Sequence, residues 1–149
     1  MRLPSPSIRL LVAAAIYAAG LSVAPGTQAA DAVVGPADRA AIHEVVQGQL
    51  EAFQHDDGSK AFSYAAPMIR EMFQTPDIFM DMVKSGYAPV YRPKQVEFGG
   101  IETIDGSPVQ HVFLIGPDGA NIDALYYMEH ETDGTWRIKG CELRQSNSA

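Results

Sequence analysis

Residues 104–138 read IDGSPVQHVFLIGPDGANIDALYYMEHETDGTWRI. Three Asp-Gly pairs, at residues 105–106, 118–119 and 133–134, separate runs in which apolar and polar residues alternate. An Asp-Gly pair between two such runs is the strongest short-range signal of a β-hairpin. The stretch therefore predicts an antiparallel meander of four strands. We place the strands near residues 94–104, 108–116, 120–131 and 135–144.

The alternation also predicts which residues share a face of the sheet, because successive side chains of a strand point to opposite faces. A two-residue turn at Asp118-Gly119 places His111 opposite Tyr126, with both side chains on the apolar face. That face would also carry Phe113 and Met128.

The last turn is expected to have three residues, 132–134, because this length returns Trp136 and Ile138 to the face of Met128. Gly134 would then adopt the left-handed conformation. Glycines at positions 99, 100 and 140 are expected at bulges that curve the sheet.

Short helices are predicted before the sheet, from apolar residues at helical spacing and from proline and capping signals. The first begins between Pro36 and Asp38 and ends near His55. A second follows the acidic residues 56–57, a third begins at Pro67, and a fourth runs from Pro76 to Gly86. Residues 87–93 contain two prolines and are expected to be extended.

The third and fourth helices are expected to turn an apolar stripe toward the core. The expected inward residues are Met68, Ile69, Met72, Phe73, Ile78, Phe79, Met82 and Val83. Methionines at positions 68, 72, 80 and 82 are typical of plain core at this spacing, and the alternative is the wall of an adaptable pocket.

The first 30 residues are interpreted as a secretory signal peptide. Arg2 and Arg9 precede or border an apolar run, residues 10–24, and small residues follow at 27–30. The run is shorter than the ~20 residues that a membrane-spanning helix needs. We therefore expect a periplasmic or secreted protein with no membrane segment after cleavage. Residues 31–37 would be a flexible lead-in, 38–145 a single domain and 146–149 a tail.

Charge and cysteine content exclude some classes of function. Without Arg2 and Arg9 the chain has 9 basic and 18 acidic residues, a net charge of −9. Nucleic acid is therefore not an expected partner, since binding it requires a basic surface. The single cysteine, Cys141, cannot form an internal disulfide and is expected to be buried and unreactive.

Helices followed by a curved antiparallel sheet, with no βαβ alternation, predict an α+β fold. Several segments resemble the bacterial domain-of-unknown-function family 4864. The most specific is Tyr87-Ala88-Pro89-Val90-Tyr91-Arg92-Pro93, and the others are residues 49–53, 61–67, 79–83 and 136–143. The resemblance implies a cone-shaped fold like that of nuclear transport factor 2 and ketosteroid isomerase, in which the sheet wraps the first helix. It implies no function, because the family has none assigned.

Candidate site residues follow from the predicted faces. His111 and Tyr126 are expected to line a ligand site inside the cone, with Tyr64 and Tyr91 at its mouth. Such a pair could also transfer a proton, but the favoured interpretation is that both residues are satisfied parts of the core. No motif of a nucleophile, phosphate loop, zinc site or calcium site is present, so no catalytic residue, metal ligand or cofactor is assigned.

The sequence favours a noncatalytic domain that binds a small hydrophobic or amphipathic ligand or serves as a protein-interaction module. A second copy of the chain, in a homodimer, is one partner that this interpretation admits. The alternative is an isomerase- or cyclase-like enzyme that uses the His111–Tyr126 pair. One observation separates these two classes: whether the cone is open and holds at least two polar groups around a void, or is filled with Phe, Met and Trp side chains.

Overall fold

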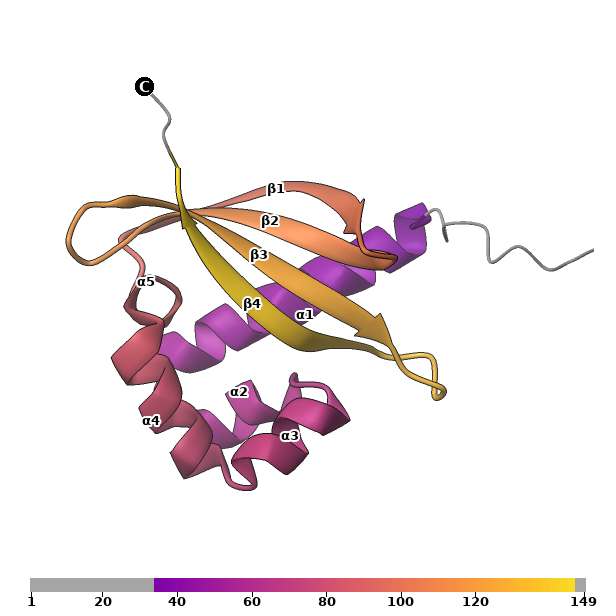
Figure 1. Ribbon diagram of the computed structural model, residues 1–149, viewed down its shortest axis with the longest axis horizontal. Helices are drawn as coiled ribbons and strands as arrows, with labels where there is room; N and C mark the ends of the chain where they lie inside the picture. Colours follow the sequence, from indigo (N-terminus) through magenta and orange to yellow (C-terminus); the bar gives the residue numbers. More distant parts are fainter. Residues whose placement is uncertain (1–33, 147–149) are drawn as a thin grey trace, which may run out of the picture. The chain divides into compact units, whose positions relative to one another are not determined.

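The Asp-Gly turns join four antiparallel strands in chain order (Figure 1). The computed structural model describes residues 34–146, so the expected signal peptide lies outside the described residues. The strands are β1 (Gln95–Ile104), β2 (Ser107–Ile115), β3 (Asn121–His130) and β4 (Trp136–Gln145). The sheet order is β1-β2-β3-β4. The predicted four-stranded meander is therefore confirmed.

Two of the three turns have the geometry that their sequences favour. Asp105 and Gly106 alone link β1 to β2, and both have positive φ, 49° and 76°, as a type I′ turn requires. At the end of β3 the backbone N–H of Glu131 donates to the carbonyl of Thr135 at 2.8 Å, which leaves three residues in the loop. Gly134 has φ of 85°. The predicted three-residue turn is confirmed.

The turn between β2 and β3 is longer than predicted. The backbone N–H of Gly116 donates to the carbonyl of Ala120 at 2.9 Å, so the loop contains Pro117, Asp118 and Gly119. Proline suits the second position of a type I turn, and Gly119 completes the loop with φ of 83°. The Asp-Gly pair therefore belongs to a three-residue loop and not to a two-residue one.

This extra residue moves the register of β2 by one position. His111 pairs with Leu125, and Gln110 pairs with Tyr126. Tyr126 still faces the helices, but His111 lies on the opposite face with Phe113. The predicted pairing of His111 with Tyr126 is wrong, because a shift of one residue exchanges the two faces of a strand.

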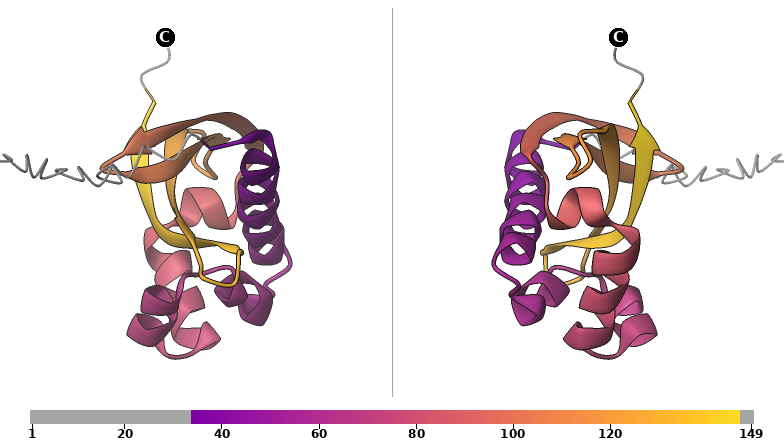
Figure 2. Two further views of the ribbon diagram at one scale, coloured as in Figure 1. Left: turned by 90° about the vertical axis from the view of Figure 1, so that its right-hand side faces the viewer. Right: turned by 90° about the vertical axis from the view of Figure 1, so that its left-hand side faces the viewer.

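Both predicted bulges are present. The β1–β2 ladder is interrupted between Phe98 and Ile101, where the two glycines lie, and the β3–β4 ladder shifts next to Gly140. On the outer face an added Cβ at Gly99 would lie 2.7 Å from the ring of Phe113, so this ring covers the bulge. Figure 2 shows the resulting curvature of the sheet.

The helices precede the sheet, which makes the fold α+β as predicted. They are α1 (Pro36–Gln54), α2 (Gly58–Ser63), α3 (Pro67–Phe73), α4 (Pro76–Gly86) and α5 (Ala88–Tyr91). Asp57 caps α2 by accepting the N–H of Lys60 at 3.0 Å, and Thr75 caps α4 by accepting the N–H of Ile78 at 3.3 Å. Within residues 34–146 no helix combines the length and apolar character needed to cross a membrane.

Helix α5 replaces the extended segment predicted for residues 87–93. Pro89 stands in the first turn, where its missing N–H removes no hydrogen bond, and Pro93 follows the end of the helix. Both prolines are therefore compatible with a single helical turn, Pro89 within it and Pro93 after it.

Helix α1 lies along the inner face of the sheet (Figure 1) and contacts both edge strands, β4 and β1. At one end the indole Nε1–H of Trp136 donates to Asp38 Oδ1 at 3.1 Å. Further along, the ring of His43 lies 4.0 Å from the ring of Phe98, measured between centroids. The predicted place of Trp136 in the core, on the face of Met128, is confirmed, since both residues are buried.

Three residues that were expected in the core are exposed instead. Met68, Met72 and Ile78 have exposed fractions of 57%, 64% and 52%. Helix α3 has only two turns, and its Ile69 and Phe73 are partly buried whereas Met68 and Met72 are exposed. In α4 the buried face is formed by Phe79, Met80 and Val83, and Ile78 lies beside it.

Truncation of Trp136 tests this description of the core. We expect Trp136→Ala to lower the free energy of unfolding by about 3–5 kcal/mol, because the ring and its hydrogen bond to Asp38 are both lost. Ile78→Ala, the control at an exposed site, should change it by less than about 0.5 kcal/mol. Urea unfolding measures both, and similar small losses for the two variants would contradict a core role for Trp136.

Candidate functional site

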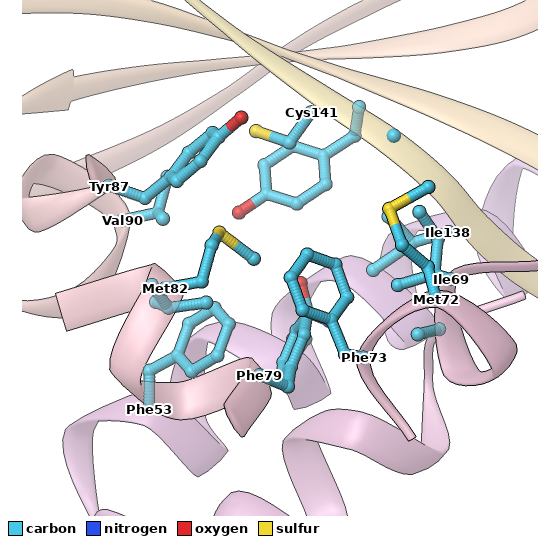
Figure 3. Close-up of a pocket in the computed structure, with 15 residues that line it drawn as sticks. Phe53, Ile69, Met72, Phe73, Phe79, Met82, Tyr87, Val90, Ile138 and Cys141 are labelled. Carbon is cyan, nitrogen blue, oxygen red and sulfur yellow. The ribbon is translucent and has the colours of Figure 1, made fainter. Parts of the chain in front are cut away.

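A pocket of about 350 Å³ lies between the helices and the β4 side of the sheet (Figure 3). Its fifteen lining residues come from α1, α3, α4, α5, β3, β4 and the segments between them, and none of them carries a charge. They are Gln49, Phe53, Ala65, Ile69, Met72, Phe73, Phe79, Met82, Val83, Tyr87, Val90, Tyr126, Ile138, Gly140 and Cys141. The pocket has the size and apolar character of small-molecule sites.

Figure 3 shows how the walls face one another. Phe73 and Met82 project from the helices toward the sheet, where Cys141 and Ile138 lie on β4. Met72 lines the pocket and is also exposed, so the pocket reaches the surface beside α3. Phenylalanine and methionine side chains form much of the wall, but they leave a void.

Tyr126 supplies the most unusual polar group of the pocket. The residue is fully buried, and its hydroxyl makes no hydrogen bond of normal geometry with the described residues. A buried polar group without a partner costs about 1–3 kcal/mol, so such groups are uncommon in folded proteins. Burial raises the pKa of Tyr126 well above its ordinary value, and the thiol of Cys141, directly across the ladder, adds to the rise.

Three further polar groups line the same pocket. Burial raises the pKa of the Cys141 thiol to about 12, although the residue as a whole is half-buried and not fully buried as expected. Gln49 donates its amide Nε2–H to the carbonyl of Ala61 at 3.1 Å. The hydroxyl of Tyr87 makes no hydrogen bond within residues 34–146, and in Figure 3 its ring points toward the part of β4 that carries Cys141.

The wall formed by β4 is fixed by backbone hydrogen bonds to the link between α2 and α3. The N–H of Ile138 donates to the carbonyl of Tyr64 at 2.9 Å, and the N–H of Ala66 donates to the carbonyl of Ile138 at 2.8 Å. Tyr64 thus supports the pocket through its backbone. Its side chain was expected at the mouth of the site, and it is not among the lining residues.

Tyr91 also lies outside the pocket. Its hydroxyl donates to Asp56, and its ring lies 4.2 Å from the guanidinium of Arg92. Arg92 donates to Asp56 Oδ2 at 2.8 Å and to the carbonyl of Phe53. The hydrogen bond from Tyr91 is the main cause that lowers the pKa of Asp56. This group, Asp56, Tyr91 and Arg92, ties α5 to the end of α1 and is called the Arg92 clamp below.

His111 lies on the outer face of the sheet, away from Tyr126. Its Nδ1 is 3.0 Å from both carboxylate oxygens of Asp123, and its Nε2 is 2.8 Å from Glu102 Oε1. Burial lowers the pKa of His111, but the hydrogen bonds to Glu102 and Asp123 outweigh it and raise the pKa above 6.5. The two carboxylates face opposite edges of the ring, so a protonated His111 links β1, β2 and β3.

Most of the lining residues were missed because tertiary packing brings them together. Met72, Met82 and Tyr87 come from separate segments, and no local pattern shows that their side chains share a void. The available signal was the methionine content of α3 and α4, for which the sequence left a pocket wall as the alternative to plain core. Met72 and Met82 line the pocket, whereas Met80 is buried in the core and Met68 is exposed.

The pH dependence of stability tests the His111 cluster. The folded state binds the proton more tightly than the unfolded state, so the stabilisation is complete below about pH 6.5 and is lost as the pH rises through the raised pKa. We therefore expect His111→Gln to destabilise the protein at about pH 5 and to have little effect at about pH 9. Urea unfolding across this range measures it. An equal loss at both ends would show that packing, and not the charge, is responsible.

Comparison with known proteins places the chain in a family. The family described as a domain of unknown function (DUF4864) matches residues 36–149. The match covers every described helix and strand, so the chain belongs to this family, as its sequence predicted. No curated protein matches the chain. No solved structure matches it either.

Proposed function

We propose that this protein is a noncatalytic binding module for a small, mainly apolar molecule, which the pocket beneath β4 encloses. The observation that carries the proposal is the buried hydroxyl of Tyr126, which lacks a partner in an otherwise apolar void. A binding site commonly combines apolar walls, which supply affinity, with a few polar groups that orient the ligand.

The volume of the pocket limits the size of the ligand. A cavity of about 150 Å³ in another protein holds benzene. The pocket of about 350 Å³ therefore suits a molecule of roughly 10 to 15 heavy atoms. Phe73, Met72 and Met82 supply aromatic and thioether surface that adapts to an apolar ligand.

The positions of His111 and Tyr126 favour binding over catalysis. The isomerase- or cyclase-like alternative needs both side chains in one cavity, and the sheet separates them. A protein-interaction module is the second candidate, supported by the exposed apolar side chains of Met68, Met72 and Ile78. A homodimer is one form of it.

Filling the pocket tests the proposal. We expect ethylnaphthalene, an uncharged fluorescent hydrocarbon of suitable size, to bind the parent protein, and Val83→Phe to weaken this binding by at least about 10-fold because the larger ring occupies the void. Val45→Phe makes the same exchange on α1 outside the pocket and should leave the affinity unchanged. Fluorescence titration measures all three proteins. Absence of binding to the folded parent protein would reject the proposal and leave the interaction module.

We also propose that the fold is the cone of nuclear transport factor 2-like proteins. The two bulges, the curvature of the sheet and the passage of α1 across its inner face support this assignment. Shared architecture of this kind carries no function by itself.

Export completes the proposal. The charge and apolar pattern of residues 1–30 supports a cleaved signal peptide and a periplasmic or secreted domain. We expect the full chain, expressed in a bacterial host, to yield exported protein that begins at Ala30 or Asp31 on N-terminal sequencing. A matched chain that begins at Asp31 should stay in the cytoplasm. Recovery of exported protein that still begins at Met1 would contradict cleavage.

A further inference from the structure

The pocket contains hydrogen-bond donors, and none of its lining residues is charged. The hydroxyl of Tyr126 is fully buried and unpartnered, and the hydroxyl of Tyr87 makes no hydrogen bond within the described residues. Cys141 contributes a thiol from the position opposite Tyr126. Burial of a hydroxyl without a hydrogen bond costs free energy. A ligand that accepts a hydrogen bond from Tyr126 removes this cost, and its binding is favoured accordingly.

The protonation of these groups fixes their role as donors. Burial keeps the pKa of Tyr126 well above 10 and that of Cys141 at about 12. Both groups therefore stay protonated at neutral pH and can donate a hydrogen bond to an oxygen of the ligand. Gln49 donates one of its two amide N–H groups to the carbonyl of Ala61.

The absence of charge among the fifteen lining residues decides what kind of oxygen is accepted. A carboxylate or an ammonium group beside the fully buried Tyr126 would lie there without a countercharge, which costs far more than a hydrogen bond returns. A neutral carbonyl or ester oxygen carries no such cost.

We infer that the pocket selects uncharged molecules in which a carbonyl or ester oxygen accepts a hydrogen bond from the Tyr126 hydroxyl while the apolar remainder lies against the α3 and α4 side chains. This inference rests on the proposed function, because it names the class of ligand for the same pocket.

A series of ligands with one ring system tests the selection. The ligands are ethylnaphthalene, methyl naphthyl ketone, naphthoate and naphthylmethylamine, which differ mainly in the polar group. By isothermal titration calorimetry at neutral pH, the ketone should bind about 3- to 10-fold more tightly than the hydrocarbon, which corresponds to one net hydrogen bond. Naphthoate and the amine should bind more weakly than the hydrocarbon.

Substitution of Tyr126 assigns the preference to its hydroxyl. Tyr126→Phe should remove the advantage of the ketone and leave the affinity for ethylnaphthalene unchanged. Because the hydroxyl has no partner in the protein, the melting temperature of Tyr126→Phe should equal or exceed that of the parent. Tyr64→Phe, which removes a hydroxyl outside the pocket, should keep the full advantage of the ketone.

The outcomes separate the two proposals. If ethylnaphthalene binds but the ketone binds no more tightly, or if naphthoate binds most tightly, the inference about ligand class is overturned and the binding function stands. An advantage of the ketone that survives in Tyr126→Phe also overturns the inference. If none of the four compounds binds the folded protein, both proposals fail.

Discussion

A single helix is too narrow to cover a four-stranded sheet, and the rest of the structure depends on this mismatch. Four strands about 4.8 Å apart span roughly 15 Å, whereas the helix that crosses them is about 10 Å wide. Helix α1 contacts β4 near Trp136 and β1 at Phe98. The inner face around Tyr126 and Cys141 needs another cover. Helices α3, α4 and α5 provide it at a distance, and the space left over is the pocket.

The position of this second cover depends on the Arg92 clamp. Arg92 reaches the carbonyl of Phe53 and the carboxylate of Asp56, which has φ of 54° in the turn after α1. An ion pair this exposed contributes little to stability. Its main effect is on position, because it holds α5, Tyr87 and Val90 close to the end of α1. The most family-specific segment thus carries two residues of the clamp, Tyr91 and Arg92, and two residues that line the pocket, Tyr87 and Val90.

The sequence predicts the parts of the fold that short-range rules govern. Turn chemistry and capping residues place the strands and four helices, and Trp136 follows from the alternation along β4. The predicted register of β2 is wrong because the loop also contains Pro117. Asp-Gly occurs in hairpin loops of two and of three residues, and only the backbone geometry distinguishes them. The face of Tyr126 is predicted correctly because apolar and polar residues alternate along β3, whereas His111 is assigned to the wrong face of the sheet. The pocket itself depends on spacing between distant helices, which no local pattern contains.

Both edges of the sheet are interrupted, and this bears on how the chain behaves among its own copies. The glycine bulge in β1, covered by Phe113, breaks the row of free backbone groups on one edge. On the other edge, the backbone N–H and C=O of Ile138 are hydrogen-bonded to Tyr64 and Ala66. A continuous free edge is the template on which strands of neighbouring molecules stack into aggregates. The sheet thus offers neighbouring copies of the chain little uninterrupted edge for strand addition.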